Sequence, residues 1–401
     1  MKLRTPEAFW LVKNGILNSY PSLKEDLTTE ILIIGGGITG SLIAHQCIKE
    51  GFEVVIADRR EIANGSTSAT TSMLQYEIDA PLYELSEMVG KKAAIQCYQA
   101  CLDSIEMLGD LCKEIKSDCG FNKKDSLFFA NLKKDVSWLK KEFNARKEAG
   151  FPVTWVEAEE IENKYKVLNT HGGILSKAGA SIDAFTFAHD LLEFNTKKGL
   201  KIFDKTNITK VKYGRAGIVA TTEHGNTIKA KKIIYCNGFE STEIIKEDFV
   251  KLLSTYASVS ERDKNNYKNI EDVLLWNTAD PYLYMRTTDD GRLLVGGEDE
   301  DFVNAEKRDS LLHQKSLKLE KAVAKYLNIK DYRTDFTWAG TFGETKDGLP
   351  YIGEHKKFPG AFFVLGFGGN GITFSVIGMK IISDLLKGKN NELAHWFRFG
   401  R

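Results

Sequence analysis

Residues 30–58 read EILIIGGGITGSLIAHQCIKEGFEVVIAD. Residues 30–34 are an apolar run of the kind that parallel sheets bury on both faces, and residues 53–57 (EVVIA) have the same character. Between them lie a glycine-rich turn and a helical segment that ends at Gly51. A strand, a helix and a second strand in this order predict a right-handed βαβ unit, which is half of a dinucleotide-binding fold.

The turn in this unit has the spacing Gly35-x-Gly37-x-x-Gly40. Gly35 permits a tight turn, Gly37 lets the backbone approach a pyrophosphate, and Gly40 lets the helix pack closely on the strand. Asp58 lies 18 residues after Gly40, where its carboxylate can accept hydrogen bonds from a ribose. A glycine-rich turn that matches by chance is the alternative interpretation, and the strands, the helix and the acid around it argue against that alternative.

A second match, Gly366-x-Gly368-x-x-Gly371, follows the apolar residues 361–365 (AFFVL). Only 30 residues follow Gly371, and they contain no second strand with a terminal acid, so this is not a second dinucleotide fold. We expect the start of the following helix to point at another electron-rich group of the same cofactor, because a helix N-terminus favours negative charge. The alternative is a glycine-rich helix start that only packs.

The composition of the 401 residues argues against several classes of protein. Lys plus Arg and Asp plus Glu both number 55, so there is no basic excess to drive nucleic-acid binding. The N-terminal residues lack the apolar core of a signal peptide, and no apolar run reaches the ~18 residues of a membrane span. The seven histidines and six cysteines form no metal-binding pattern. We therefore expect a cytoplasmic protein with reduced thiols and no metal site, and with neither nucleic acid nor an integral membrane segment.

Further segments resemble those of one family. They are residues 65–74 (GSTSATTSML), 205–211 (KTNITKV), 233–241 (IIYCNGFES), 338–353 (WAGTFGETKDGLPYIG) and 366–373 (GFGGNGIT). With the opening βαβ unit, they resemble the D-amino-acid oxidase superfamily, in the branch of glycine oxidase, sarcosine oxidase and γ-glutamylputrescine oxidase. The resemblance runs from about residue 29 to about residue 386. The family's Ala-Thr-Gly turn is Cys236-Asn237-Gly238 here, which is a mild departure.

The resemblance implies one FAD, a flavoprotein oxidoreductase, and C–N bond oxidation by hydride transfer to flavin N5. Sarcosine oxidases attach their flavin to a cysteine at the position of Gly340, and residues 333–364 contain no cysteine, so we expect noncovalent FAD. The residues that the motifs and the resemblance together assign to the cofactor are Gly35, Gly37, Ile38, Thr39, Gly40, Asp58, Arg59, Ser66, Thr67, Ser68, Ser72, Ile208, Asn237, Gly238, Gly340, Gly368, Gly369, Asn370, Gly371, Ile372 and Thr373.

The substrate side carries a second departure. Amino-acid oxidases of the family place a carboxylate-binding arginine where this chain has Phe342, and its loss favours amine substrates. Tyr282, Tyr284 and Arg286 alternate along one predicted strand and therefore share a face. We interpret them as an aromatic wall with a guanidinium that anchors an anionic tail; tyrosines in the core and an exposed arginine fit the pattern equally well. Tyr284, Arg286 and Phe342 are the candidate catalytic residues.

The expected fold is α/β (α+β overall), with a discontinuous Rossmann-type FAD-binding domain and an antiparallel-sheet substrate domain. We assign residues 1–81, 180–240 and 336–401 to the first domain, and residues 82–179 and 241–335 to the second. The predicted function is oxidation of a small amine or amino acid, with oxygen or a quinone as the acceptor. Alternatives are a dehydrogenase with a quinone or protein acceptor, a tRNA-modifying flavoprotein, and a flavin-binding module without turnover.

Overall fold

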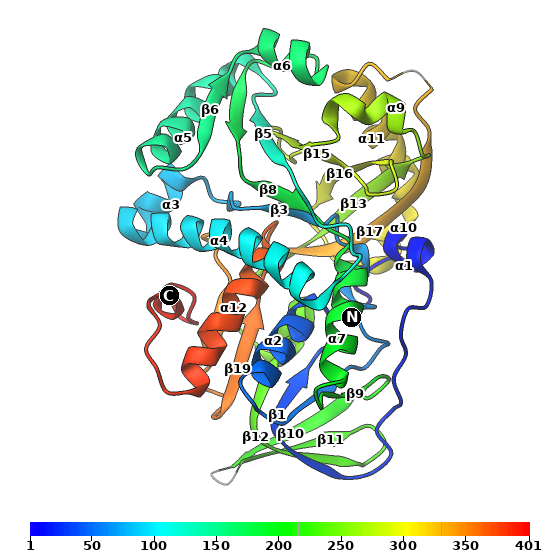
Figure 1. Ribbon diagram of the computed structural model, residues 1–401, viewed down its shortest axis with the longest axis vertical. Coiled ribbons are helices and arrows are strands. Elements are labelled where there is room, and N and C mark those ends of the chain that lie inside the picture. Colours follow the sequence, from blue (N-terminus) through cyan, green and yellow to red (C-terminus); the bar gives the residue numbers. More distant parts are fainter. Residues whose placement is uncertain (215–216, 330) are drawn as a thin grey trace.

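The computed structural model describes residues 1–214, 217–329 and 331–401. It contains two eight-stranded sheets and one three-stranded sheet, and the helices pack around them (Figure 1). The mixed α/β class expected from the sequence is confirmed.

The first large sheet contains the opening βαβ unit. Its central strands β9, β2, β1, β12 and β19 are mutually parallel, while β10, β11 and β18 pair antiparallel at its edges. The strands are β1 (Leu27–Ile34), β2 (Val54–Ala57), β9 (Lys201–Phe203), β10 (Ile208–Gly214), β11 (Gly217–Thr222), β12 (Thr227–Tyr235), β18 (Tyr351–Glu354) and β19 (Ala361–Leu365).

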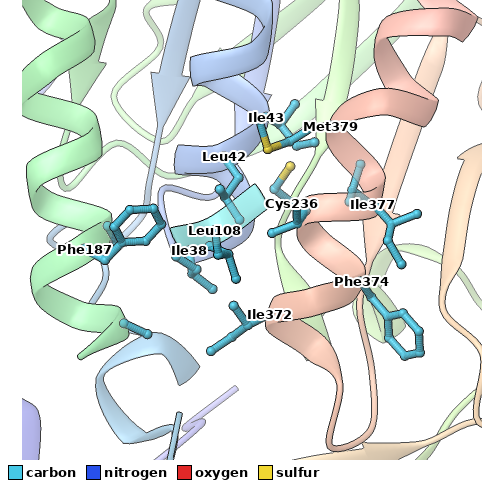
Figure 2. Close-up of a cluster of buried hydrophobic side chains, with 14 of the residues drawn as sticks. Ile38, Leu42, Ile43, Leu108, Phe187, Cys236, Ile372, Phe374, Ile377 and Met379 are labelled. Carbon is cyan, nitrogen blue, oxygen red and sulfur yellow. The ribbon is translucent and has the colours of Figure 1, made fainter. Parts of the chain in front are cut away.

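Successive residues of β1 are buried in different cores, as expected for a strand covered on both faces. Ile31 and Ile33 belong to a core shared with helices α2, α4, α7 and α12, whereas Leu32 belongs to a core on the opposite face. Figure 2 shows side chains of α2 and α12 in the first core, with Cys236 between them. The helices are α2 (Ile38–Lys49), α4 (Lys91–Ile115), α7 (Ala184–Thr196) and α12 (Gly371–Leu386).

The second large sheet has the order β17-β13-β16-β15-β14-β5-β7-β6, and every pairing except β14 with β5 is antiparallel. It contains β5 (Asp125–Phe129), β6 (Val153–Val156), β7 (Gly173–Ser176), β13 (Lys251–Ser260), β14 (Val273–Asn277), β15 (Tyr284–Thr287), β16 (Leu293–Glu300) and β17 (Thr334–Glu344). Because β17 pairs with β13, the first residues of the expected segment 336–401 lie in this sheet rather than in the parallel one.

The remaining elements are a small sheet and the other helices. A small sheet joins β3 (Met73–Gln75), β4 (Asn122–Lys123) and β8 (Gly179–Ser181). The other helices are α1 (Phe9–Asn14), α3 (Leu82–Val89), α5 (Val136–Glu148), α6 (Ala158–Tyr165), α8 (Ser241–Ile244), α9 (Lys264–Tyr267), α10 (Ala305–Ser310), α11 (Leu312–Tyr326) and α13 (Glu392–Trp396). Within the described ranges, none of the helices is long and apolar enough to cross a membrane.

The N-terminal residues pair with a strand from the other end of the chain. The amide of Thr341 donates to the carbonyl of Leu3 at 2.7 Å, and the amide of Thr5 donates to the carbonyl of Ala339 at 3.0 Å. These bonds place Arg4 opposite Gly340 on β17, and α1 follows against the same region. The segment thereby contributes Leu3 to the lining of the cavity described below.

Candidate active site

A cavity of about 430 Å³ lies between the two large sheets. Its walls include Ile34, Ala57 and Cys236 at the carboxyl ends of β1, β2 and β12, and also residues of β13, β15 and β17. The carboxyl ends of parallel strands are where open α/β sheets bind their ligands. The cavity therefore lies where the sequence places a dinucleotide.

The glycines of the first motif lie where the chain leaves little room for a side chain. Gly35 has φ +102°, and a Cβ there would lie 2.6 Å from the carbonyl oxygen of Cys236 on the neighbouring strand. At Gly40, a Cβ would collide with the carbonyl oxygen of Gly35. At Gly37, it would lie 2.9 Å from Oγ1 of Thr67. Any larger residue would push α2 away from β1 or fill the cavity beside the helix start.

Asp58 follows β2 and lines the cavity. Its Oδ2 accepts from the amide of Gly36 at 2.7 Å, and its Oδ1 accepts from the amide of Arg60 at 2.8 Å. Burial raises the pKa of this carboxyl. Beside it, the guanidinium groups of Arg59 and Arg60 both pair with Glu240, and the Arg60 Nη2 to Glu240 Oε1 distance is 2.6 Å. The basic groups at this end are thus held by a carboxylate of the chain itself.

The second glycine motif precedes α12. Oγ1 of Thr39 and Oγ of Ser375 lie 2.7 Å apart, so a hydrogen bond connects the starts of α2 and α12. The amide of Gly369 donates to Oδ2 of Asp79 at 3.0 Å. A Cβ at Gly368, where φ is +72°, would collide with the same carboxylate. The second glycine motif therefore packs against the carboxylate of Asp79, a residue that follows β3 in the chain.

Three successive carbonyls in the segment that follows Ser68 each have a buried donor. Nε1 of Trp338 donates to Ala69 at 2.8 Å, Nε1 of Trp10 donates to Thr70 at 2.6 Å, and Nε of Arg286 donates to Thr71 at 2.7 Å. Ala69, Thr70 and Thr71 line the cavity. Donors from three distant parts of the chain thus fix one wall.

Arg286 does not anchor a substrate at the cavity, contrary to our interpretation of the sequence. Its Nη1 donates to the carbonyl of Thr287 at 3.2 Å, and its Nη2 donates to the carbonyl of Ile182 at 3.1 Å, in addition to the bond to Thr71. The side chain is buried, lies over Trp10 and is not among the cavity-lining residues. Alternation along a strand predicts the face on which a residue lies, but not the partners of its side chain. Here the Arg286 guanidinium binds backbone carbonyls and does not reach the cavity.

The end of the cavity opposite Asp58 is aromatic. Tyr282, Tyr284 and Phe342 line it, and the two tyrosine rings lie 5.6 Å apart at 41°. A Cβ at Gly296, the neighbour of Tyr284 on β16, would lie 2.4 Å from that ring, so the missing side chain makes room for the tyrosine. Burial raises the pKa of both tyrosines, which therefore stay neutral at physiological pH.

The cavity brings together most of the residues that the sequence assigned to the cofactor. Those that line it are Gly35, Gly37, Ile38, Thr39, Asp58, Arg59, Ser66, Thr67, Ser72, Ile208, Asn237, Gly238, Gly340, Gly368, Gly369, Gly371 and Ile372. Four assigned residues lie outside. Gly40 packs against Gly35, and Ser68 and Thr373 donate to the carbonyls of Gly65 and Asn370. Asn370 itself donates to the carbonyl of Gln75.

Other lining residues were not predicted. They include Leu3, Gln75, Glu240, Thr255 and Tyr256. Because Glu240 lies two residues after the Asn237-Gly238 turn, its position in the sequence could have predicted that it lines the cavity. Nothing local in the sequence indicates that Leu3 returns to β17.

The structure also contains polar groups suited to a bound cofactor. Within the described residues, Oγ of Ser72 and Oδ1 of Asn237 are buried without a hydrogen-bond partner, and both residues line the cavity. Buried polar atoms of this kind normally have partners. A dinucleotide with hydroxyl, phosphate and ring groups supplies such partners along the whole length of the cavity, so these residues fit FAD.

Comparison with known proteins gives the class and then the family. The chain is a flavin-dependent oxidoreductase, and residues 30–385 match the family of FAD dependent oxidoreductases known as DAO, to which it belongs. The expected enzyme class, FAD as cofactor and resemblance to the D-amino-acid oxidase superfamily are thereby confirmed. Within the described residues, no cluster of three or more His, Cys, Asp or Glu is arranged to hold a metal ion.

Individual relatives are distant. The protein YhfW of Bacillus subtilis (strain 168), whose name carries a Rieske 2Fe-2S iron-sulfur designation, is 25% identical over 98% of this chain and 75% of its own length. Gamma-glutamylputrescine oxidoreductase of Escherichia coli (strain K12) is 21% identical, over 92% of this chain and 86% of its own. The crystal structure of glycine oxidase from Geobacillus kaustophilus has a TM-score of 0.78 at 20% identity, covering 93% of this chain and 99% of that one. This likeness establishes the fold.

Proposed function

We propose that this protein oxidises the C–N bond of a small amine that carries no carboxylate beside the reacting carbon. The observation that supports this is the charge of the cavity. Among the residues that the structure describes, the only Lys or Arg side chains that line it are Arg59 and Arg60, which belong to the Asp58 end and pair with Glu240. The aromatic end offers no guanidinium fork for a carboxylate, because Arg286 is engaged elsewhere.

The residues of the chain bind and orient the reactants. The turn at Gly35–Gly37, the start of α2, Asp58 and the wall at residues 69–72 would hold FAD. When bound, FAD would supply the two-electron acceptor for the hydride of the C–H bond beside the amine nitrogen, so that the substrate's C–N bond becomes C=N. Tyr282, Tyr284 and Phe342 exclude water and hold the neutral amine in place, and this positioning provides most of the rate enhancement.

Anaerobic flavin reduction tests the proposal. The purified holoenzyme is mixed without oxygen with a panel of primary amines, secondary amines and amino acids, and the loss of visible flavin absorbance is followed. Amines should bleach the flavin, whereas glycine and D-alanine should do so poorly. Rapid bleaching by small amino acids together with inert amines would overturn the proposal.

The electron acceptor is a separate part of the proposal. Oxygen and quinones are both candidate electron acceptors for a chain with one dinucleotide unit. The name of the Bacillus subtilis relative suggests an iron–sulfur protein as a third candidate. Reoxidation of the bleached enzyme distinguishes them. Fast recovery of colour in air indicates an oxidase, and recovery only with a quinone or an iron–sulfur acceptor indicates a dehydrogenase.

A further inference from the structure

A second cavity of about 180 Å³ adjoins the first and shares Gln75, Tyr282 and Gly369 with it. Three aromatic side chains from separate elements form part of its wall: Phe128 of β5, Trp138 of α5 and Trp276 of β14. Phe128 stacks on Trp276 at 3.6 Å, and Trp138 meets Phe128 edge-on at 5.8 Å. Aromatic faces of this kind attract ammonium groups.

The charged groups of this cavity are predominantly acidic. Glu77, Asp79 and Arg146 line it, and Arg146 is held by Glu142, whose Oε1 accepts from the guanidinium Nε at 2.5 Å. The contact between Arg146 Nη1 and Glu77 Oε1 is longer, at 3.4 Å. The guanidinium therefore contacts two carboxyl groups, and the contact to Glu142 is the shorter one.

Glu77 is the distinctive member of this set. Its side chain is 1% exposed, and within the described residues its Oε2 has no hydrogen-bond partner. Burial raises the pKa of this carboxyl despite the nearby Arg146 guanidinium, because an ionised group is costly away from water. A cation that enters the cavity would provide the missing partner and favour the ionised form.

We propose that this second cavity is a subsite for a positively charged tail, so that the substrate is a diamine or a related amine with a distal ammonium group. The inference rests on the proposed function, since the reacting end of the same molecule would lie beside Tyr282 and Tyr284 in the first cavity. Tyr282 borders both cavities, and a flexible alkyl chain spans from one to the other past it.

The first experiment measures binding without turnover. Tetramethylammonium, which has no nitrogen lone pair to support oxidation, is titrated into the holoenzyme while tryptophan fluorescence and the flavin difference spectrum are followed. We expect saturable binding. Trp138→Leu should weaken it about tenfold, and so should Glu77→Gln. Trp155→Leu, a change to another half-buried tryptophan near α5 that lies outside the cavity, should leave it unchanged.

The second experiment compares substrates of equal length in anaerobic flavin reduction: a diaminoalkane, the matching monoamine and the matching amino carboxylic acid. The concentration that gives half-maximal flavin reduction should be about ten- to a hundredfold lower for the diamine than for the monoamine. Trp138→Leu should bring these two concentrations closer together. Equal values for diamine and monoamine, or absent tetramethylammonium binding, would overturn the subsite. A preference for the acid would overturn it too, and would assign the tail to Arg146. If no amine reduces the flavin while tetramethylammonium binds at Trp138, the proposed function fails and the cation site stands.

Discussion

Replacing Arg286 with methionine tests whether this side chain supports the fold or binds the substrate. The guanidinium donates to the carbonyls of Thr71, Ile182 and Thr287, which lie in three different segments. Burial lowers its pKa to about 10, so it remains charged at neutral pH. Methionine fills a similar volume with no donor, and it leaves these carbonyls without their partners.

The expected loss of stability follows from these contacts. A hydrogen bond from a charged donor contributes about 1.5–3 kcal/mol, and bonds that share one side chain do not add fully. We expect the free energy of unfolding to fall by roughly 3–5 kcal/mol, which for a chain of 401 residues corresponds to a melting temperature lower by about 4–6 °C. Because Thr71 belongs to the wall of the first cavity, the affinity for FAD should also fall.

Thermal denaturation of the apoprotein, followed by far-ultraviolet circular dichroism, and a titration with FAD measure both effects. Arg262→Met is the matched control, because the Arg262 side chain is 65% exposed and pairs with Asp290 at the surface. It should change stability by less than about 0.5 kcal/mol. If Arg286→Met melts at the wild-type temperature and binds FAD normally, yet loses activity toward acidic substrates, the guanidinium binds substrate and the structural argument is refuted.

Further expectations concern the cofactor and the second cavity. Asp58→Ala should weaken FAD binding, because it removes a carboxylate from the cavity and leaves the amides of Gly36 and Arg60 without their acceptor; an unchanged Kd in an apoprotein titration would contradict this. Gly40→Val should abolish FAD binding, because its Cβ collides with the carbonyl of Gly35, and a variant that purifies yellow would count against it. Acid precipitation should leave the yellow colour in the supernatant, since residues 333–364 contain no cysteine; colour in the pellet would show covalent attachment. Tetramethylammonium should bind more tightly as the pH rises through about 6, because desolvation and the negative charges of Glu344 and Asp299 raise the pKa of Asp79 to about 6, and the cation needs the ionised form of this carboxyl; a constant Kd across this range would exclude Asp79 from the subsite.

The sequence was most informative where structure is local. The βαβ unit, the turn at Gly35 and the helix after Gly371 each follow from residues close together in the chain, and the structure contains all of them. A hydroxyl in a motif gives less information, because Ser68 and Thr373 bond to nearby carbonyls rather than lining the cavity. Local pattern specifies the backbone well and the direction of a polar side chain poorly.

Features assembled from distant segments could not be predicted. The period of a strand placed Arg286 on a face, but the partners that decide its role come from residues 71 and 182. Phe128, Trp138 and Trp276 line one cavity although up to 148 positions separate them. Neither arrangement leaves a recognisable spacing in the chain, because tertiary packing creates it.

The return of the N-terminal segment to β17 has a consequence for biosynthesis. The lining of the first cavity begins at Leu3 and ends at Ile372, so a ribosome must translate all of residues 3–372 before the last wall of this cavity can form. Strand pairing between residues 3–5 and 339–341 also spans more than three hundred positions, and contacts of such separation form late and slowly. Complete flavin loading therefore requires translation through the start of α12. A nascent chain stalled before α12 should expose the apolar faces of α2 and β1 to chaperones.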